Sequence, residues 1–277
     1  MRAFETLQFT LPVGLHLDGH HINTFTLNHV TGRLRREMLD AGTQAKANTA
    51  AMRHVIASLG TQEKPEAIPR PDLGLIRRLC GPDVDYINFV LCAREFDNSI
   101  AKWEEICPGH GPDRPCGAKL PIELDLRQVE LIEATGDVHF NKDGNPYQQT
   151  SFVDPITNQE VQIAIRLSNL GDLERATERA LQALKDNKGA KVGSMAFAEL
   201  TNLIFRFGTK NGLTAEDLDN MPYKTLTALE RATGQVRPRQ LDSDVVHTCA
   251  TCYRDCTFSV SWDMWQDPFG GQGPSPS

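Results

Sequence analysis

The sequence predicts an α+β fold in which two related helix–cysteine turn–strand modules follow an N-terminal β-hairpin and helix. Short segments of alternating apolar and polar residues, typical of strands, are interspersed with segments in which apolar residues recur every three or four positions, as in helices. Each half of the chain then has the same order of helix, breaker, helix, cysteine turn and strand. Ile122 lies six residues after Cys116, and Phe258 lies six residues after Cys252. This equal spacing favours a duplicated module.

The first region, residues 1–60, is predicted to begin with the β-hairpin. Apolar and polar residues alternate at positions 7–11 and 24–27, as they do in strands with one buried face. Asp18 and Gly19 lie between these two segments and are typical residues of a hairpin turn.

A helix is predicted to follow the hairpin over residues 33–60. Apolar residues recur at helical spacing along this segment, Gly42 weakens its middle, and Gly60 ends it. Residues 61–72 contain three prolines and mostly polar side chains, which is typical of a linker.

The first module, residues 61–170, is predicted to hold two short helices, a cysteine turn and a β-rich extension. A Gly-Pro pair at residues 81–82 separates the helices, and Asp83 is placed to cap the second. The strand that begins at Ile122 follows the cysteine turn, and alternation within residues 129–167 predicts further strands.

The second module, residues 171–277, repeats this plan. Leucine and alanine at helical spacing predict a long helix from Gly171, and another helical segment ends at residue 207. Thr214 and Asp217 have the spacing of a capping box at the start of the next helix. A cysteine turn and the strand from Phe258 complete the module.

Each module carries a pair of cysteines in its turn, Cys107 with Cys116 and Cys249 with Cys252. A Cys-x2-Cys pair can hold a metal ion between two thiolates, and the first turn is equivalent to such a pair with a longer loop. Zinc prefers four ligands at the corners of a tetrahedron. Since each turn supplies two, the sequence predicts one structural zinc ion per chain that joins both modules.

Other arrangements of these residues stay open. The two turns can instead carry free thiols or form a disulfide, although seven cysteines are an odd number for full pairing. His110, His247 or Cys256 can replace one of the four cysteines as a ligand, and Cys256 is otherwise a strand-entry residue. Cys80 and Cys92 lie among apolar residues of predicted helices and are expected in the core.

Composition and motif content limit the classes of function. The net charge of −7 at pH 7 provides no basic footprint for nucleic acid. No apolar run is long enough for a membrane span, and the N-terminus lacks the apolar segment of a signal peptide. The chain contains no H-E-x-x-H, Walker A, G-x-S-x-G or G-x-G-x-x-G motif. The sequence therefore predicts no catalytic residues, no small-molecule substrate and no enzymatic activity.

Several motifs occur in one order along the chain. They are LQFTLPVGL at residues 7–15, TGR at 31–33, LIRRLCGPDVDYINFVL at 75–91, the CP…CG…IELDL turn at 107–126, and C-x2-C…FSVSW…DPF from Cys249. Together these motifs resemble the baseplate hub assembly proteins of contractile-tailed, T-even-type bacteriophages. The first turn departs from the Cys-x2-Cys pattern, because eight residues separate its two cysteines.

This resemblance implies a role in virion assembly, either as an assembly chaperone of the hub or as a minor baseplate component. It implies partners among the hub and other tail proteins, in the host cytoplasm during assembly and in the tail baseplate if the protein is retained. The alternative is a zinc-ribbon enzyme or regulator of cellular origin.

Overall fold

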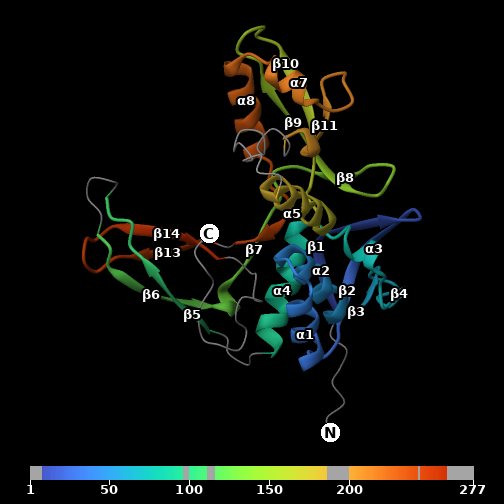
Figure 1. The fold of residues 1–277 in the computed structure, drawn as a ribbon, viewed down its shortest axis with the longest axis vertical. Helices are drawn as coiled ribbons and strands as arrows, with labels where there is room; N and C mark the ends of the chain where they lie inside the picture. The colour runs from blue at the N-terminus through green and yellow to red at the C-terminus, as the bar shows by residue number, and fades with distance from the viewer. Residues whose placement is uncertain (1–7, 96–99, 111–115, 186–199, 243, 261–277) are drawn as a thin grey trace. The chain divides into compact units, whose positions relative to one another are not determined.

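The structure is a computed structural model that describes residues 8–95, 100–110, 116–185, 200–242 and 244–260 (Figure 1). Its helices and antiparallel sheets confirm the predicted α+β class. The chain divides into two compact units, each formed by two separate segments. Unit 1 comprises residues 1–84 and 133–239, and unit 2 comprises residues 85–132 and 240–277.

The first sheet of unit 1 has the strand order β1–β2–β3–β4. Its strands are β1 (Gln8–Leu17), β2 (His20–Leu27), β3 (Ile56–Gly60) and β4 (Ile68–Pro69). The predicted N-terminal hairpin is confirmed, and Asp18 and Gly19 in its turn have φ values of 49° and 80°. Such left-handed values are tolerated by aspartate and are free of steric cost for glycine.

The predicted helix over residues 33–60 is only partly correct. α1 (Gly32–Asp40) and α2 (Gln44–Val55) are separate helices, and Gly42 between them has a φ of 76°. Residues 56–60 form β3 instead of the last helical turn, because they pair with β2. Apolar residues in so short a segment fit both the helical period and the strand period. Pairing with β2 therefore decides that the segment is a strand.

A buried carboxylate in the first turn of α4 (Gly81–Glu95) holds a bulge of β1 in place. The bulge includes Gly14, whose φ is 77° and which has no room for a Cβ. The Asp83 carboxylate accepts hydrogen bonds from the Val13 and Gly14 amides at 2.9 to 3.2 Å, and the Cys80 thiol donates to it at 3.2 Å. The predicted helix cap at Asp83 is therefore wrong, since its side chain bonds to β1.

The second sheet of unit 1 has the strand order β11–β10–β9–β8. Its strands are β8 (Val138–Phe140), β9 (Pro146–Val153), β10 (Glu160–Arg166) and β11 (Ile204–Phe207). α7 (Ala215–Asp219) and α8 (Tyr223–Gly234) contribute to the same apolar core, which contains Phe152, Ile163 and Leu229.

Two local predictions in this part of the chain have different outcomes. The capping box is confirmed, with the Asp217 amide donating to the Thr214 hydroxyl at 3.1 Å and the Thr214 amide donating to the Asp217 carboxylate at 3.0 Å. Residues 204–207, predicted as the end of a helix, form β11 and pair with β10. Tertiary pairing again overrides local periodicity.

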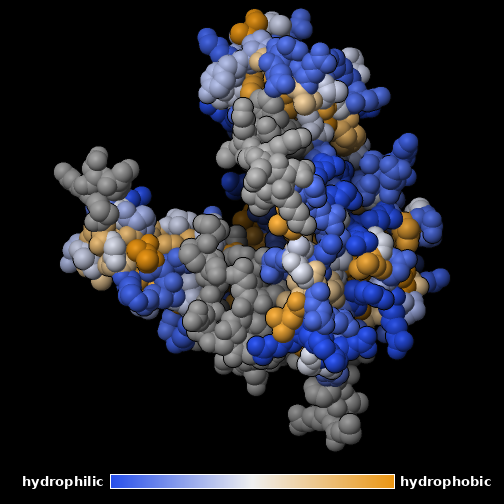
Figure 2. Space-filling model, in the orientation of Figure 1, coloured by the Kyte–Doolittle hydropathy of each residue, from blue (hydrophilic) through white to orange (hydrophobic). Residues whose placement is uncertain are grey.

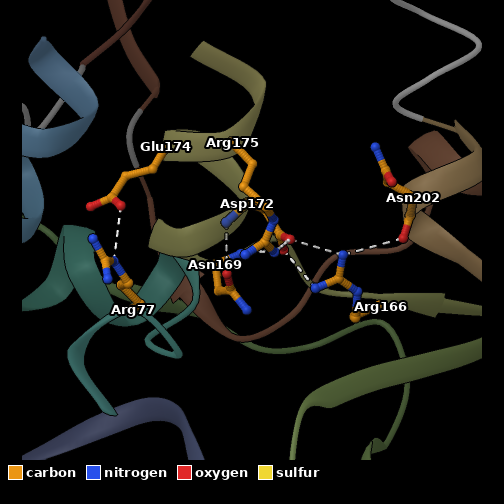
Figure 3. A network of polar contacts seen from close by, with 7 residues as sticks. All are labelled: Arg77, Arg166, Asn169, Asp172, Glu174, Arg175 and Asn202. Atoms are coloured by element: carbon orange, nitrogen blue, oxygen red, sulfur yellow. Dashed lines mark hydrogen bonds and ion pairs between the residues drawn. The ribbon is translucent and has the colours of Figure 1, made fainter. Parts of the chain in front are cut away.

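A polar network fixes the start of α5 (Leu170–Lys185) (Figure 3). Asn169 and Asp172 cap each other, since the backbone amide of each donates to the side chain of the other at 3.1 and 2.9 Å. Arg166, the last residue of β10, donates to both oxygens of the Asp172 carboxylate at 2.6 and 3.0 Å. Arg175 also pairs with Asp172, so the carboxylate joins the helix to the second sheet.

Acidic residues of α5 connect it to two helices of the first half of the unit. The buried carboxylate of Glu174 accepts a hydrogen bond from Arg77, which follows α3 (Leu73–Ile76), at 2.9 Å (Figure 3). Lys46 of α2 pairs with Glu178 at 2.9 Å. These ion pairs join α5 to α2 and to the end of α3.

Unit 2 contains two β-hairpins of the same plan. β5 (Ile100–Ile106) pairs with β6 (Lys119–Asp125), and β13 (Asp244–Thr248) pairs with β14 (Asp255–Ser259). The two cysteine turns are the loops of these hairpins. The strands predicted after the turns are confirmed as β6 and β14, and each begins three residues earlier than predicted.

The inner faces of both hairpins contribute to one apolar core. Its buried members include Trp103 of β5, Ile122 of β6 and Cys256 of β14. β7 (Leu131–Ile132) and β12 (Gln240–Leu241) form a short pair that connects the two chain segments of the unit.

Exposed apolar side chains are scattered. On the face shown in Figure 2, apolar residues form small separate groups among polar ones. Large exposed examples are Leu39, Tyr223 and Tyr253. Isolated side chains of this kind are normal on folded proteins and imply no separate function. Among the described residues, no helix combines the length and the apolarity that a membrane span requires.

The burial of Asp83 predicts a pH-dependent stability. Burial raises the pKa of its carboxyl group from 3.8 to about 6, although the Val13 amide and the Cys80 thiol oppose the shift. Between these values the folded chain binds a proton that the unfolded chain releases, so the free energy of unfolding falls as pH rises. The free energy of unfolding should therefore be about 3 kcal/mol lower at pH 7 than at a pH below both pKa values, because of this group alone.

We expect Asp83→Asn to remove this part of the pH dependence, because the amide does not titrate. Urea unfolding of both proteins at pH 5 and pH 7 measures the difference. Asp40→Asn, which removes an exposed carboxylate from the same unit, is the matched control and should keep the wild-type slope. An unchanged slope in Asp83→Asn would contradict the assignment.

Candidate metal centre

The four predicted ligands come together in unit 2. The sulfur atoms of Cys107, Cys116, Cys249 and Cys252 all lie within 4.8 Å of one another. Cys107 and Cys252 are 3.6 Å apart, and Cys116 and Cys249 are 3.9 Å apart. A tetrahedron of thiolates around zinc, with bonds of about 2.3 Å, has sulfur–sulfur edges of about 3.8 Å. Two of the sulfur–sulfur distances match this edge, and the group of four could hold a metal ion.

The first turn positions its sulfurs with backbone hydrogen bonds at the ends of β5 and β6. The Cys107 amide donates to the Ala118 carbonyl at 2.9 Å, and the Gly117 amide donates to the Cys107 carbonyl at 3.1 Å. Gly117 has a φ of 68°, which glycine adopts freely. The Gly109 amide points at the Cys107 sulfur, 3.4 Å away. The turn thus presents its first sulfur with an N–H donor beside it.

The second turn is shorter and is closed in the same way. The Cys249 amide donates to the Arg254 carbonyl at 2.9 Å, and the Tyr253 amide donates to the Cys249 carbonyl at 2.8 Å. Tyr253 has a φ of 57°, an uncommon conformation for a large side chain. The ring of Tyr253 is exposed, so the strained backbone position serves the turn rather than the core.

Side chains also connect the two turns directly. Arg254 donates a hydrogen bond to the carbonyl of Gly109. Nε2 of His110 donates to the carbonyl of Cys252 at 3.1 Å. Each turn therefore supports the backbone of the other beside the sulfurs. The residue pattern does not predict this role of Arg254, although its position two residues after Cys252 is a local signal.

The thiols have unequal proton affinities. The amides of Cys252 and Thr251 lower the pKa of Cys249 to about 6 despite its burial. The Gly109 amide acts in the same direction on Cys107, but burial and the neighbouring thiols leave the pKa of Cys107 raised. Without a cation, one thiolate can be shared among neighbouring thiols. A divalent ion would displace the remaining protons, so its binding is expected to release protons.

The alternative ligands lie outside the group of four. His110 is occupied by the hydrogen bond to Cys252, and His247 is a half-buried residue of β13 opposite Cys256. The Cys256 sulfur is 3.6 Å from that of Cys107, but it is not within reach of all the other sulfurs. Among the described residues, the four cysteines are the set that satisfies the distances for one ion.

The remaining cysteines have separate environments. Cys80 is fully buried beside Asp83, as predicted for a core cysteine. Cys92 is half-buried and packs against the apolar core of unit 2.

Cys107 and Cys249 are 1 % and 0 % exposed, so the four-cysteine centre is continuous with that core. Four thiolates would also fill every position of a tetrahedral ion, which is the pattern of a structural site.

Replacement of single cysteines tests the ligand set. We expect Cys252→Ser to weaken metal binding about 100-fold or more and to lower the melting temperature, because it removes one of four ligands. Cys256→Ser is the matched control, since it changes a neighbouring thiol outside the group. Competition with a chromophoric chelator measures affinity. Equal effects of the two substitutions would show that the ligand set is wrong.

Comparison with known proteins does not place the chain in a family. No protein-family model matches it. No curated protein matches it either, and neither does any solved structure.

Proposed function

We propose that unit 2 binds one structural zinc ion per chain through Cys107, Cys116, Cys249 and Cys252. The main support for this site is that the four sulfurs, which come from two separate turns, all lie within 4.8 Å of one another. Thiolates favour soft or borderline ions, and a tetrahedral set of four is typical of zinc. The ion would fasten the two hairpin loops to each other and would stabilise the core beneath them.

The centre supports a structural role better than a catalytic one. A catalytic zinc ion keeps a position open for water or substrate, and four protein thiolates leave none. Within the described residues, no carboxylate or histidine joins the four sulfurs as a metal-ligating group. We therefore propose that the chain acts by binding other proteins and that the zinc ion holds a binding scaffold in shape.

We further propose that this scaffold is a baseplate hub assembly protein of a contractile-tailed phage, either a chaperone or a minor baseplate component. The motif order from LQFTLPVGL to the terminal Cys-x2-Cys supports this proposal. A metal-fastened unit without an open metal position is compatible with it. The competing possibility is a zinc-ribbon enzyme or regulator of cellular origin.

Purified protein should contain close to one equivalent of zinc per chain, measured by elemental analysis against protein mass. Removal of the ion by a strong chelator at neutral pH should lower the melting temperature, because binding free energy contributes to folding. Zinc added back should restore it. A metal content near zero in a folded protein with free thiols would contradict the zinc proposal.

Deletion of the gene in the phage tests the assembly role. We expect filled heads, with tails that are absent or lack baseplates, while the other tail proteins are still made. Electron microscopy and protein blots of infected cells provide the readout, and a plasmid copy should restore normal tails. Normal contractile particles in the mutant would contradict the role, and zinc-dependent turnover of a substrate would favour the cellular alternative.

A further inference from the structure

A fifth cysteine lies beside the four candidate ligands. Cys256 of β14 is 3 % exposed, and its sulfur is 3.6 Å from that of Cys107. The sulfur of Cys252, which belongs to the group of four, is at the same distance from Cys107. Cys256 nevertheless does not lie within reach of all four sulfurs. It therefore contacts one ligand without belonging to the ligand set, and the zinc proposal alone gives its thiol no role.

A metal ion in this centre would leave negative charge on the sulfurs. Four thiolates carry more negative charge than one divalent ion neutralises. Cys107 and Cys249 are almost completely buried, so water stabilises little of this excess charge. Buried charge is tolerated when hydrogen-bond donors replace the lost water. The centre therefore needs donors that point at its sulfurs.

The two turns provide such donors from their own backbones. In each case the amide two residues after the cysteine hydrogen-bonds to its sulfur: Gly109 for Cys107, Ala118 for Cys116 and Thr251 for Cys249. The shared offset of two residues holds even though the loop of the first turn is longer than that of the second. Main-chain donors are thus a common feature of both turns.

The Cys256 thiol is placed to give Cys107 a second donor. A thiolate that binds a metal ion has no proton, so within this pair only Cys256 can donate. A thiol is a weak donor, and the 3.6 Å between the two sulfurs suits an S–H···S hydrogen bond. The competing acceptor is the carbonyl of Arg254, 3.8 Å from the Cys256 sulfur. The thiolate is favoured over this carbonyl, because hydrogen bonds to charged acceptors are stronger.

We propose that Cys256 is a positioning residue of the metal centre, which donates an S–H hydrogen bond to the Cys107 thiolate. The bond stabilises buried negative charge and lowers the energy of the sulfur lone pairs, so the metal ion is retained more firmly. This inference rests on the proposed metal centre. It goes beyond the ligand set, because it assigns a role to a cysteine that does not bind the ion.

Cobalt(II) in place of zinc makes the sulfur electrons visible through the sulfur-to-metal charge-transfer band. We expect Cys256→Ala to shift this band to longer wavelength, since the lone pairs of Cys107 rise in energy when the donor is lost. Cobalt affinity should fall about fivefold. Cys256→Ser is the matched control, because its hydroxyl can still donate at nearly the same size, and its band and affinity should stay close to wild type.

The wild-type chain loaded with NMR-active cadmium provides a second measurement that needs no variant. A scalar coupling between the cadmium nucleus and the Cys256 thiol proton should cross the hydrogen bond. The Gly109 amide proton is the internal reference, since it also faces the Cys107 sulfur. A coupling to Gly109 without one to Cys256 would overturn the proposal.

The cobalt results separate this inference from the metal centre itself. Identical bands and affinities in all three proteins would overturn the hydrogen bond and leave the four-cysteine site standing. Equal shifts in the alanine and serine variants would also overturn it, because they would indicate a change of packing. Loss of cobalt binding in Cys256→Ala would show that Cys256 is itself a ligand. A wild-type chain that binds no cobalt would contradict the metal centre, and the inference would fall with it.

Discussion

The convergence of two hairpin loops on four sulfur atoms is the constraint on which unit 2 depends. Its two chain segments, residues 85–132 and 240–277, are separated in sequence by a large part of unit 1. The hairpins bury a modest core that continues directly into Cys107 and Cys249. An ion held by all four thiolates would act as a cross-link between distant segments. A cross-link that closes so long a loop restricts the unfolded chain strongly.

Unit 1 uses two carboxylates for the corresponding task, the buried Asp83 and the half-buried Asp172. Asp83 satisfies two amides at the bulge of β1, and Asp172 satisfies its own helix cap together with Arg166. In a low-dielectric interior a carboxylate such as Asp83 is favourable only when every partner is in place. The two carboxylates consequently specify one arrangement of strand and helix, whereas apolar contacts alone tolerate several. Burial destabilises the ionised form of Asp83, as its raised pKa indicates, so this specific arrangement lowers stability at neutral pH.

These two devices would give each unit a fixed scaffold. Four thiolates would fill every position that a tetrahedral ion offers, so a metal ion bound here would stabilise the fold and leave no position open for a substrate.

The sequence by itself determined the α+β class, the N-terminal hairpin, the capping box at Thr214 and the four cysteines that come together. Each of these follows from local chemistry: alternation, turn residues, a side chain three residues from its amide partner, or paired thiols near a strand. The six-residue spacing from Cys116 and Cys252 located both β6 and β14 to within three residues. A shared pattern was enough because both turns close the same kind of hairpin.

Tertiary structure decided the rest. Residues 56–60 and 204–207 have apolar patterns that fit a helix, yet they are strands because β2 and β10 offer unpaired edges beside them. Asp83 has the sequence position of a helix cap, but its carboxylate bonds to amides far away in sequence, which local spacing does not encode. Distance in space also excludes Cys256, which the sequence had left open as an alternative ligand, from the group of four sulfurs. Long-range pairing and burial depend on the whole chain, and a sequence pattern records only near neighbours.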